Sequence, residues 1–118
     1  MITKYYMDFS FTDTLFEGDK KGYTEFLEIS IDEFEIDFPK LKTALETKDP
    51  ELFSAVKHKF STRLNTFQLT SLEDFMQEIT NNYKNDVHSV DAAMAIAELE
   101  RHQRGIVEAL KEKLTSVS

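Results

Sequence analysis

His58 is the side chain of this sequence best suited to covalent chemistry near neutral pH. The chain has no Cys, which excludes thiolate nucleophiles, disulfides and cysteine-based zinc sites. An imidazole that is neutral at neutral pH is a competent nucleophile. Lys57 and Lys59 flank His58, and cations help phosphoryl transfer because that reaction depends mainly on positioning and charge neutralisation. These residue types predict a phosphoryl acceptor at His58, with any Mg²⁺ brought by a partner.

The charge pattern around His58 also favours an anionic group. The chain has a formal net charge of −8, yet residues 52–72 contain no Asp or Glu. Lys57, Lys59 and Arg63 lie inside this window. We therefore expect an anion to be tolerated here.

Helical periodicity places His58 on a solvent face. In a helix over residues 50–66, His58 lies about 175° from the centre of the apolar stripe, at about 100° per residue. Its helical neighbours are small or short polar side chains, namely Ser54, Ala55, Ser61, Thr62 and Asn65. This predicts an exposed and unshielded imidazole. The alternative interpretation is an ordinary surface histidine, which is the usual role of such a residue.

The elements that must position His58 are all helices. Apolar residues recur at three- and four-residue spacing, and the chain has only three Gly and two Pro. We predict a short helix near residues 12–16, a long one over 21–46 with a kink at Pro39, and others over 50–66, 70–83 and 90–114. Short connections favour antiparallel neighbours. The fold class is predicted as all-α, an antiparallel up-and-down four-helix bundle with a short N-terminal helix, in one domain over residues 1–118.

Three helix starts carry capping signals. Asp49 before Pro50 predicts an N-cap followed by a first-turn proline. Thr70 and Glu73 have the spacing of a capping box. Ser89 is predicted to cap the last helix.

The last helix is predicted to bury one heptad-like row and to leave its histidine at the surface. The buried row is Ala92, Ile96, Leu99, Gln103, Ile106, Leu110 and Leu114. His88 and His102 are assigned surface or boundary roles. Because the histidines are scattered and lack paired carboxylates, we expect no metal site and no cofactor.

Composition argues against several classes of partner and location. The net charge of −8 argues against nucleic acid and anionic membranes as partners. The N-terminus lacks the pattern of a secretory signal, and no apolar run approaches the roughly 20 residues that span a bilayer. We therefore expect a cytoplasmic protein.

Three stretches between residues 22 and 78 together carry a resemblance to a known protein family. They are a long helical segment containing DFPKL at 37–41, a helix start DPELF at 49–53, and VKHKF at 56–60 followed by Leu64 and a helical segment over 69–79. This pattern resembles the histidine-containing phosphotransfer (HPt) domain of bacterial multistep phosphorelays, and the similarity covers nearly the whole chain.

The resemblance implies that His58 accepts a phosphoryl group from a receiver-domain aspartate and passes it to another aspartate. The protein would then be a phosphorelay intermediate in a two-component system rather than a free-standing enzyme. Its partners would be a response-regulator receiver domain, a hybrid histidine kinase, or both. The predicted phosphoryl- and partner-binding residues around His58 are Lys57, Lys59, Ser61, Thr62, Arg63 and Asn65.

Two positions depart from the family motif, which reads His, any residue, Leu, Lys, Gly, Ser. Ser61 stands where the family has its lysine, and Thr62 where it has the glycine that lets the receiver approach. A second hypothesis follows, in which a degenerate HPt-like bundle binds a receiver or kinase without carrying phosphate. In a third, the chain is an unrelated helical adaptor that binds through an apolar patch away from His58.

Overall fold

The computed structural model is all-helical over residues 5–118, the part of the chain that it describes. Six α-helices and one short 3₁₀-helix follow one another, and no strand occurs in this part. They are α1 (Ser10–Leu15), α2 (Lys20–Glu46), α3 (Pro50–Lys59), α4 (Ser61–Thr66), α5 (Thr70–Asn85), η1 (Val87–Ser89) and α6 (Ala92–Val117). The predicted all-α class is confirmed.

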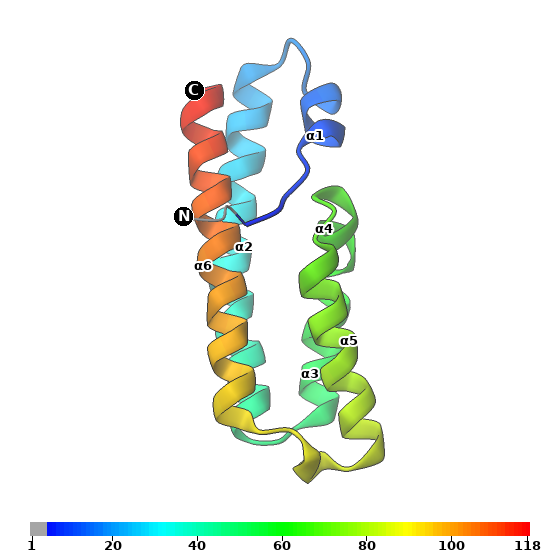
Figure 1. Ribbon diagram of the computed structural model, residues 1–118. Helices are drawn as coiled ribbons and strands as arrows, with labels where there is room; N and C mark the ends of the chain where they lie inside the picture. The colour runs from blue at the N-terminus through cyan, green and yellow to red at the C-terminus, as the bar shows by residue number, and fades with distance from the viewer. Residues whose placement is uncertain (1–4) are drawn as a thin grey trace.

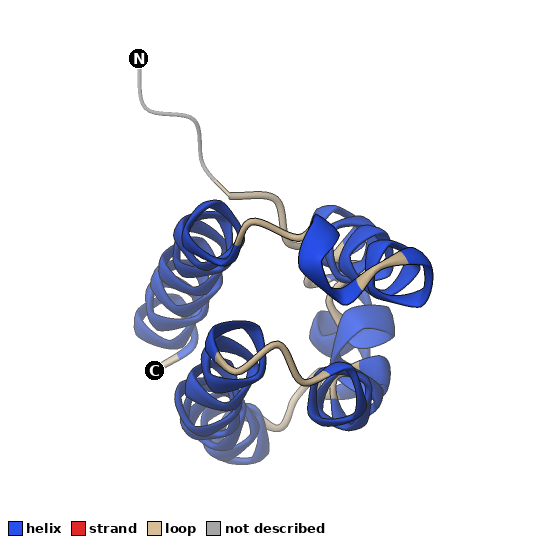
Figure 2. Ribbon diagram, turned by 90° about the horizontal axis from the view of Figure 1, so that it is seen from below, coloured by secondary structure: helices blue, strands red, loops and turns tan. Residues whose placement is uncertain are grey.

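The long helices lie side by side around a shared interior. Figure 1 shows α2 next to α6 on one side of the molecule, and α3 next to α5 on the other. A contact between α2 and α3 joins the two sides. Viewed end-on, the helices surround one interior (Figure 2), where their buried apolar side chains form a core cluster.

The predicted positions of α1 and α2 are close to the observed ones. Gly18 follows α1 with φ +79, a left-handed conformation that suits glycine because it has no Cβ. The Asp19 carboxylate then caps α2 by accepting a hydrogen bond from the Gly22 amide at 2.9 Å. Pro39 lies inside α2 and is exposed, and α2 continues past it.

The start of α3 follows the predicted capping signal. The Asp49 carboxylate accepts a hydrogen bond from the Leu52 amide at 3.1 Å, and Pro50 is the first helical residue, where its missing N–H costs nothing. This part of the prediction is confirmed.

Two other predicted caps are wrong. α5 begins at Thr70 itself with Leu69 as N-cap, and no side chain caps it. α6 is capped by Asp91, whose carboxylate accepts from the Met94 amide, while Ser89 lies in η1 and donates its hydroxyl to the Asp86 carbonyl. Side chains that could act as caps lie near both starts, and the path of the loop decides whether one of them reaches a free amide.

The helix predicted over residues 50–66 is two helices. α3 ends at Lys59, Phe60 forms a turn, and α4 begins at Ser61. Phe60 is fully buried between Phe34 and Phe38, with ring centroids 5.6 and 5.3 Å away. The prediction of one continuous helix is therefore wrong, although its apolar stripe is correct on both sides of the turn.

The buried row of α6 also differs from the predicted one. It consists of Ala95, Leu99, His102, Ile106 and Leu110. His102 is 1% exposed, so its assignment to the surface is wrong. Gln103, predicted to be buried, is partly exposed. His88 is exposed in η1, as predicted.

Over residues 5–118, none of the helices has both the length and the apolar character needed to cross a lipid bilayer.

Candidate functional site

His58 lies in the last turn of α3 and is exposed, as the periodicity predicts. Lys57 and Lys59 share this turn, so three side chains that can carry positive charge stand at the negative end of the helix dipole. Ser54, Ala55, Ser61, Thr62 and Asn65 are all exposed. The face around the imidazole is therefore open and made of short side chains.

The turn at Phe60 fixes the backbone beneath His58. The Phe60 amide donates to the Lys57 carbonyl at 3.0 Å, which tightens the end of α3. The Ser61 hydroxyl donates to the His58 carbonyl at 2.7 Å. Ser61 therefore stabilises the backbone at the end of the helix that carries the imidazole.

Lys57 reaches across to α5. Its ammonium donates to the Gln77 side-chain oxygen at 2.8 Å, and the Gln77 amide nitrogen in turn donates to Asn81 at 3.0 Å. Partial burial lowers the pKa of Lys57, and the nearby positive charge of Lys84 adds to this effect. A cation is thus held in a defined position next to His58.

A depression of about 450 Å³ contains the imidazole. Ser54, Lys57, His58, Ser61 and Asn65 line it from α3 and α4. Its other wall is α5, which contributes Glu73, Asp74 and Gln77. The window that is free of acids in sequence is therefore not free of acids in space, because α5 brings two carboxylates to this depression.

The sequence did not predict that α5 contributes residues to the depression around His58. Glu73 and Gln77 lie one helical turn apart and flank the buried Leu72 and Met76, a spacing that places them at the edge facing a neighbouring helix. That signal identifies candidates, but which helix they face depends on the packing of α5 against α3.

Arg63 lies apart from this group of residues. Its side chain is only 10% exposed, and its guanidinium bonds the Asp37 carboxylate at 2.5 Å and lies 3.5 Å from Glu33. It also packs over the Phe34 and Phe60 rings. The structure therefore directs Arg63 toward α2 and into the protein, where burial of its charge is compensated by Asp37.

Lys59 and Thr62 are exposed but do not line the depression. Of the predicted site residues, Lys57, Ser61 and Asn65 are thus brought together with His58. No group of three or more metal-ligating side chains occurs over residues 5–118.

The arrangement supplies an accessible nucleophile, one positioned cation and two carboxylates at the rim. Such an open site can receive a group carried by another macromolecule, but it does not enclose a small substrate.

Comparison with known proteins gave no match: no family model, no curated protein and no solved structure is similar to this chain.

Proposed function

We propose that this protein is a histidine phosphotransfer protein of a two-component phosphorelay, with His58 as the phosphoacceptor. The proposal includes the arrangement of the helices, an antiparallel up-and-down four-helix bundle with a short N-terminal helix. The observation that carries it is the exposed His58 imidazole in an open depression beside the held ammonium of Lys57. The resemblance of residues 22–78 to the HPt family supports the same proposal.

The proposed transfer step moves a phosphoryl group from an aspartate to His58. The lone pair of one imidazole nitrogen attacks the phosphorus of an aspartyl phosphate on the receiver. The N–P bond forms as the P–O bond to the aspartate breaks, and the carboxylate leaves with the bonding electrons. The ring keeps its proton on the other nitrogen, and the reverse steps pass the group to a second aspartate.

Two features of the chain assist this step. The Lys57 ammonium offsets the negative charge of the transferred oxygens. The short side chains of Ser54, Ser61 and Asn65 around the ring let the surface of a second domain approach. Any Mg²⁺ belongs to the receiver.

The test is transfer from a receiver that carries a labelled phosphoryl group. Mixing should place an acid-labile label on the wild-type protein. His58→Gln should abolish it, while the matched variant His88→Gln, at another exposed histidine, should keep it. Absence of label with every receiver of the source organism, or full labelling of His58→Gln, would contradict the proposal.

A second candidate function is a non-catalytic module that binds a receiver or kinase. Glu73 and Asp74 at the wall of the depression favour it, because their carboxylates repel a phosphoryl dianion. Ser61 also supplies no cation where the HPt motif has a lysine. Receiver binding of unchanged affinity in His58→Ala, together with no transfer by the wild type, would select this function.

A further inference from the structure

A second concave surface lies between α5 and α6. This groove, of about 590 Å³, extends along residues 71–82 of α5 and along α6 as far as His102. At 1.5 Å per residue, the α5 side is about 17 Å long. α6 packs mainly against α2, which leaves this side of α6 open toward α5.

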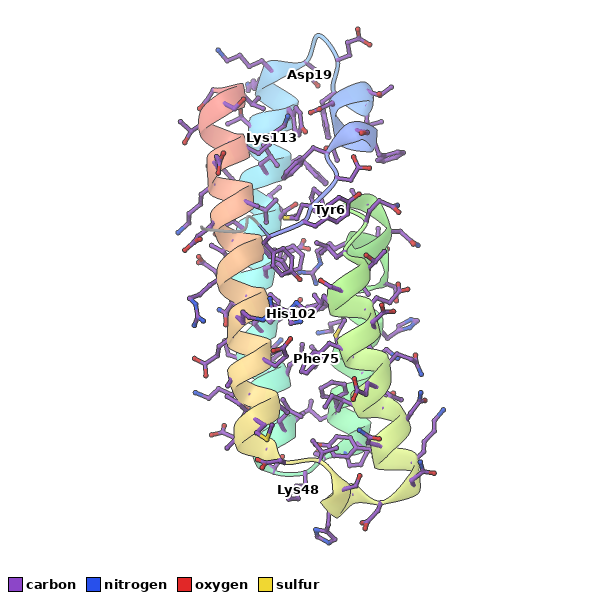
Figure 3. The ribbon with its side chains drawn as sticks, viewed as in Figure 1. Tyr6, Asp19, Lys48, Phe75, His102 and Lys113 are labelled. Carbon is purple, nitrogen blue, oxygen red and sulfur yellow. The ribbon has the colours of Figure 1, made fainter. Side chains whose placement is uncertain are left out.

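The floor of the groove is apolar. Phe75 of α5 and His102 of α6 point toward one another across it (Figure 3), and their rings stack with centroids 5.3 Å apart. Ile79 and Ala95 extend the floor. Met94 stands beside it with 72% of its surface exposed, and methionine adapts readily to the shape of an apolar partner.

The rim of the groove is acidic. Asp74 and Glu78 lie along α5, and neither has an ion-pair partner within residues 5–118. On α6, Glu98 pairs with Arg101 at 2.6 Å, so the one cation of the groove is already neutralised. An apolar floor and unpaired carboxylates at the rim favour an occupant that has an apolar face flanked by positive charges.

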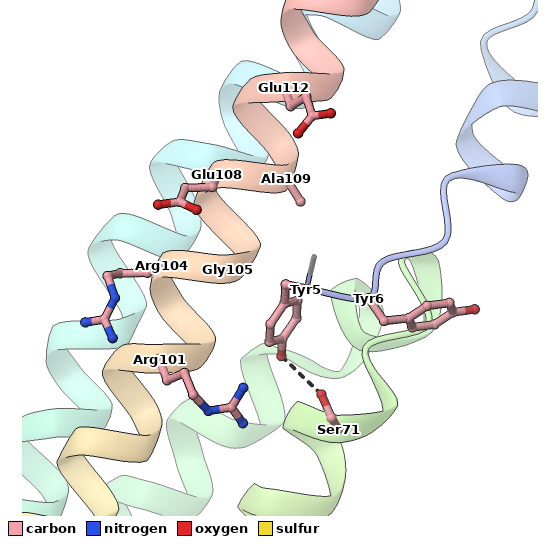
Figure 4. A pocket seen from close by; sticks show the side chains of 9 residues that line it. All are labelled: Tyr5, Tyr6, Ser71, Arg101, Arg104, Gly105, Glu108, Ala109 and Glu112. Atoms are coloured by element: carbon pink, nitrogen blue, oxygen red, sulfur yellow. Dashed lines mark hydrogen bonds between the residues drawn. The ribbon is translucent and has the colours of Figure 1, made fainter. Parts of the chain in front are cut away.

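The chain's own N-terminal segment lies at one end of the groove, where Tyr5 contacts two of the residues that line it. The Tyr5 hydroxyl lies 2.5 Å from the His102 Nδ1 atom and accepts a hydrogen bond from Ser71 at 3.3 Å. Gly105 permits this close approach, because a Cβ there would overlap the Tyr5 ring. Figure 4 shows Tyr5 between α5 and α6, with Ser71 on one side and Gly105 on the other. This end of the groove therefore already binds an aromatic side chain, from a segment that passes between α5 and α6.

We infer that the groove between α5 and α6 is a docking site for a basic amphipathic helix of a partner protein. Its apolar face would pack on Phe75, Ile79 and Met94, and its Lys and Arg residues would pair with Asp74 and Glu78. This is the helix-in-groove mode of recognition. The groove shares Asp74 with the wall of the His58 depression but does not include the imidazole, so the inference goes beyond phosphotransfer and does not depend on it.

The probe is a synthetic helical peptide of about 15 residues, with Leu on one face and Lys on the other. The control peptide has Glu in place of every Lys and the same apolar face. Titration into the isotopically labelled protein should shift amide resonances of α5 and α6 around the groove, and the control peptide should not. Because the rim contacts are ionic, affinity should fall as salt is raised.

Two protein variants test the location. Glu78→Lys should weaken binding about tenfold, equivalent to about 1.4 kcal/mol, and Met94→Lys should weaken it at least as much. The matched controls lie on the exposed side of α2, outside the groove. Glu25→Lys replaces an exposed acid, as Glu78→Lys does, and Ile29→Lys replaces an exposed apolar residue, as Met94→Lys does. These controls should leave the affinity unchanged.

Three outcomes overturn the inference. One is equal weakening by the α2 variants, which would mean non-specific attraction to an acidic protein. Another is a set of shifts spread over the whole surface. The third is concentration-dependent shifts at the groove without peptide, which would make a second copy of the chain the occupant.

Discussion

His58 and His102 carry the same side chain in opposite environments. His58 is exposed in the last turn of α3, in a depression lined by α3, α4 and α5. His102 is buried mid-helix, with both ring nitrogens near partners: Tyr5 at 2.5 Å and Glu98 at 3.4 Å. The comparison teaches that availability for chemistry depends on what surrounds the imidazole. His58 is free to react with a partner, whereas His102 holds the N-terminal segment and α6 together.

The largest difference between the surroundings of His58 and His102 is expected in the free energy of unfolding. His102→Ala should lower the free energy of unfolding by about 3 kcal/mol, because it leaves a cavity under Phe75 and removes the hydrogen-bond partner of Tyr5. Urea unfolding followed by circular dichroism measures this. A loss below about 0.5 kcal/mol, the usual range for surface positions, would remove the distinction between the two histidines.

A smaller effect is expected for the partner of His102. Tyr5→Phe keeps the ring but removes the hydroxyl, and should cost about 1 kcal/mol. Hydrogen exchange of the backbone of residues 5–9 should also become faster, since the hydroxyl helps to hold this segment. Tyr6→Phe is the matched control, because the Tyr6 side chain is 59% exposed, and it should change neither measurement.

The pH dependence of stability should also distinguish the two regions. Burial lowers the pKa of His102 below its usual 6.5, and the positive charge of Arg101 adds to this. The unfolded chain then binds this proton more readily than the folded one, so stability decreases as the pH falls below about 6.5 and levels off below the folded pKa.

Unfolding curves measured between neutral and mildly acidic pH test this sign. His102→Gln should remove the slope that belongs to this residue, and His88→Gln should retain it. The lowered pKa of Glu98, due mainly to its hydrogen bond with Arg101, acts at lower pH. Its stabilisation is present above the usual carboxyl range and is lost as the pH falls through the folded pKa.

The smallest expected effect on stability belongs to the proposed phosphoacceptor. His58→Gln should change the free energy of unfolding by less than about 0.5 kcal/mol, because the exposed ring contributes little packing. The same urea experiment measures it. A loss comparable to that of His102→Ala would show that His58 has a structural role and would weaken its assignment as a reactive group.

Local sequence by itself determined the helical class, the start of α3 and the exposure of His58. The reason is that these features depend on neighbours within one or two turns: Asp49 caps the amide of Leu52, and the apolar stripe of α3 fixes which face is left for His58. The apolar stripe could also be predicted across the break between α3 and α4, because Val56 before it, Phe60 at it and Leu64 after it are all buried.

Only the tertiary structure decided which side chains meet. Arg63 turns toward Asp37, which lies 26 positions away in sequence, and α5 brings Glu73 and Asp74 to the His58 depression. His102 and Gln103 are both polar and adjacent, so periodicity could not choose between them. The contact with Tyr5, 97 positions earlier in the chain, gives the His102 ring a hydrogen-bond partner. Hydrophobic spacing encodes a buried face, whereas the pairing of polar groups depends on how the helices pack against one another.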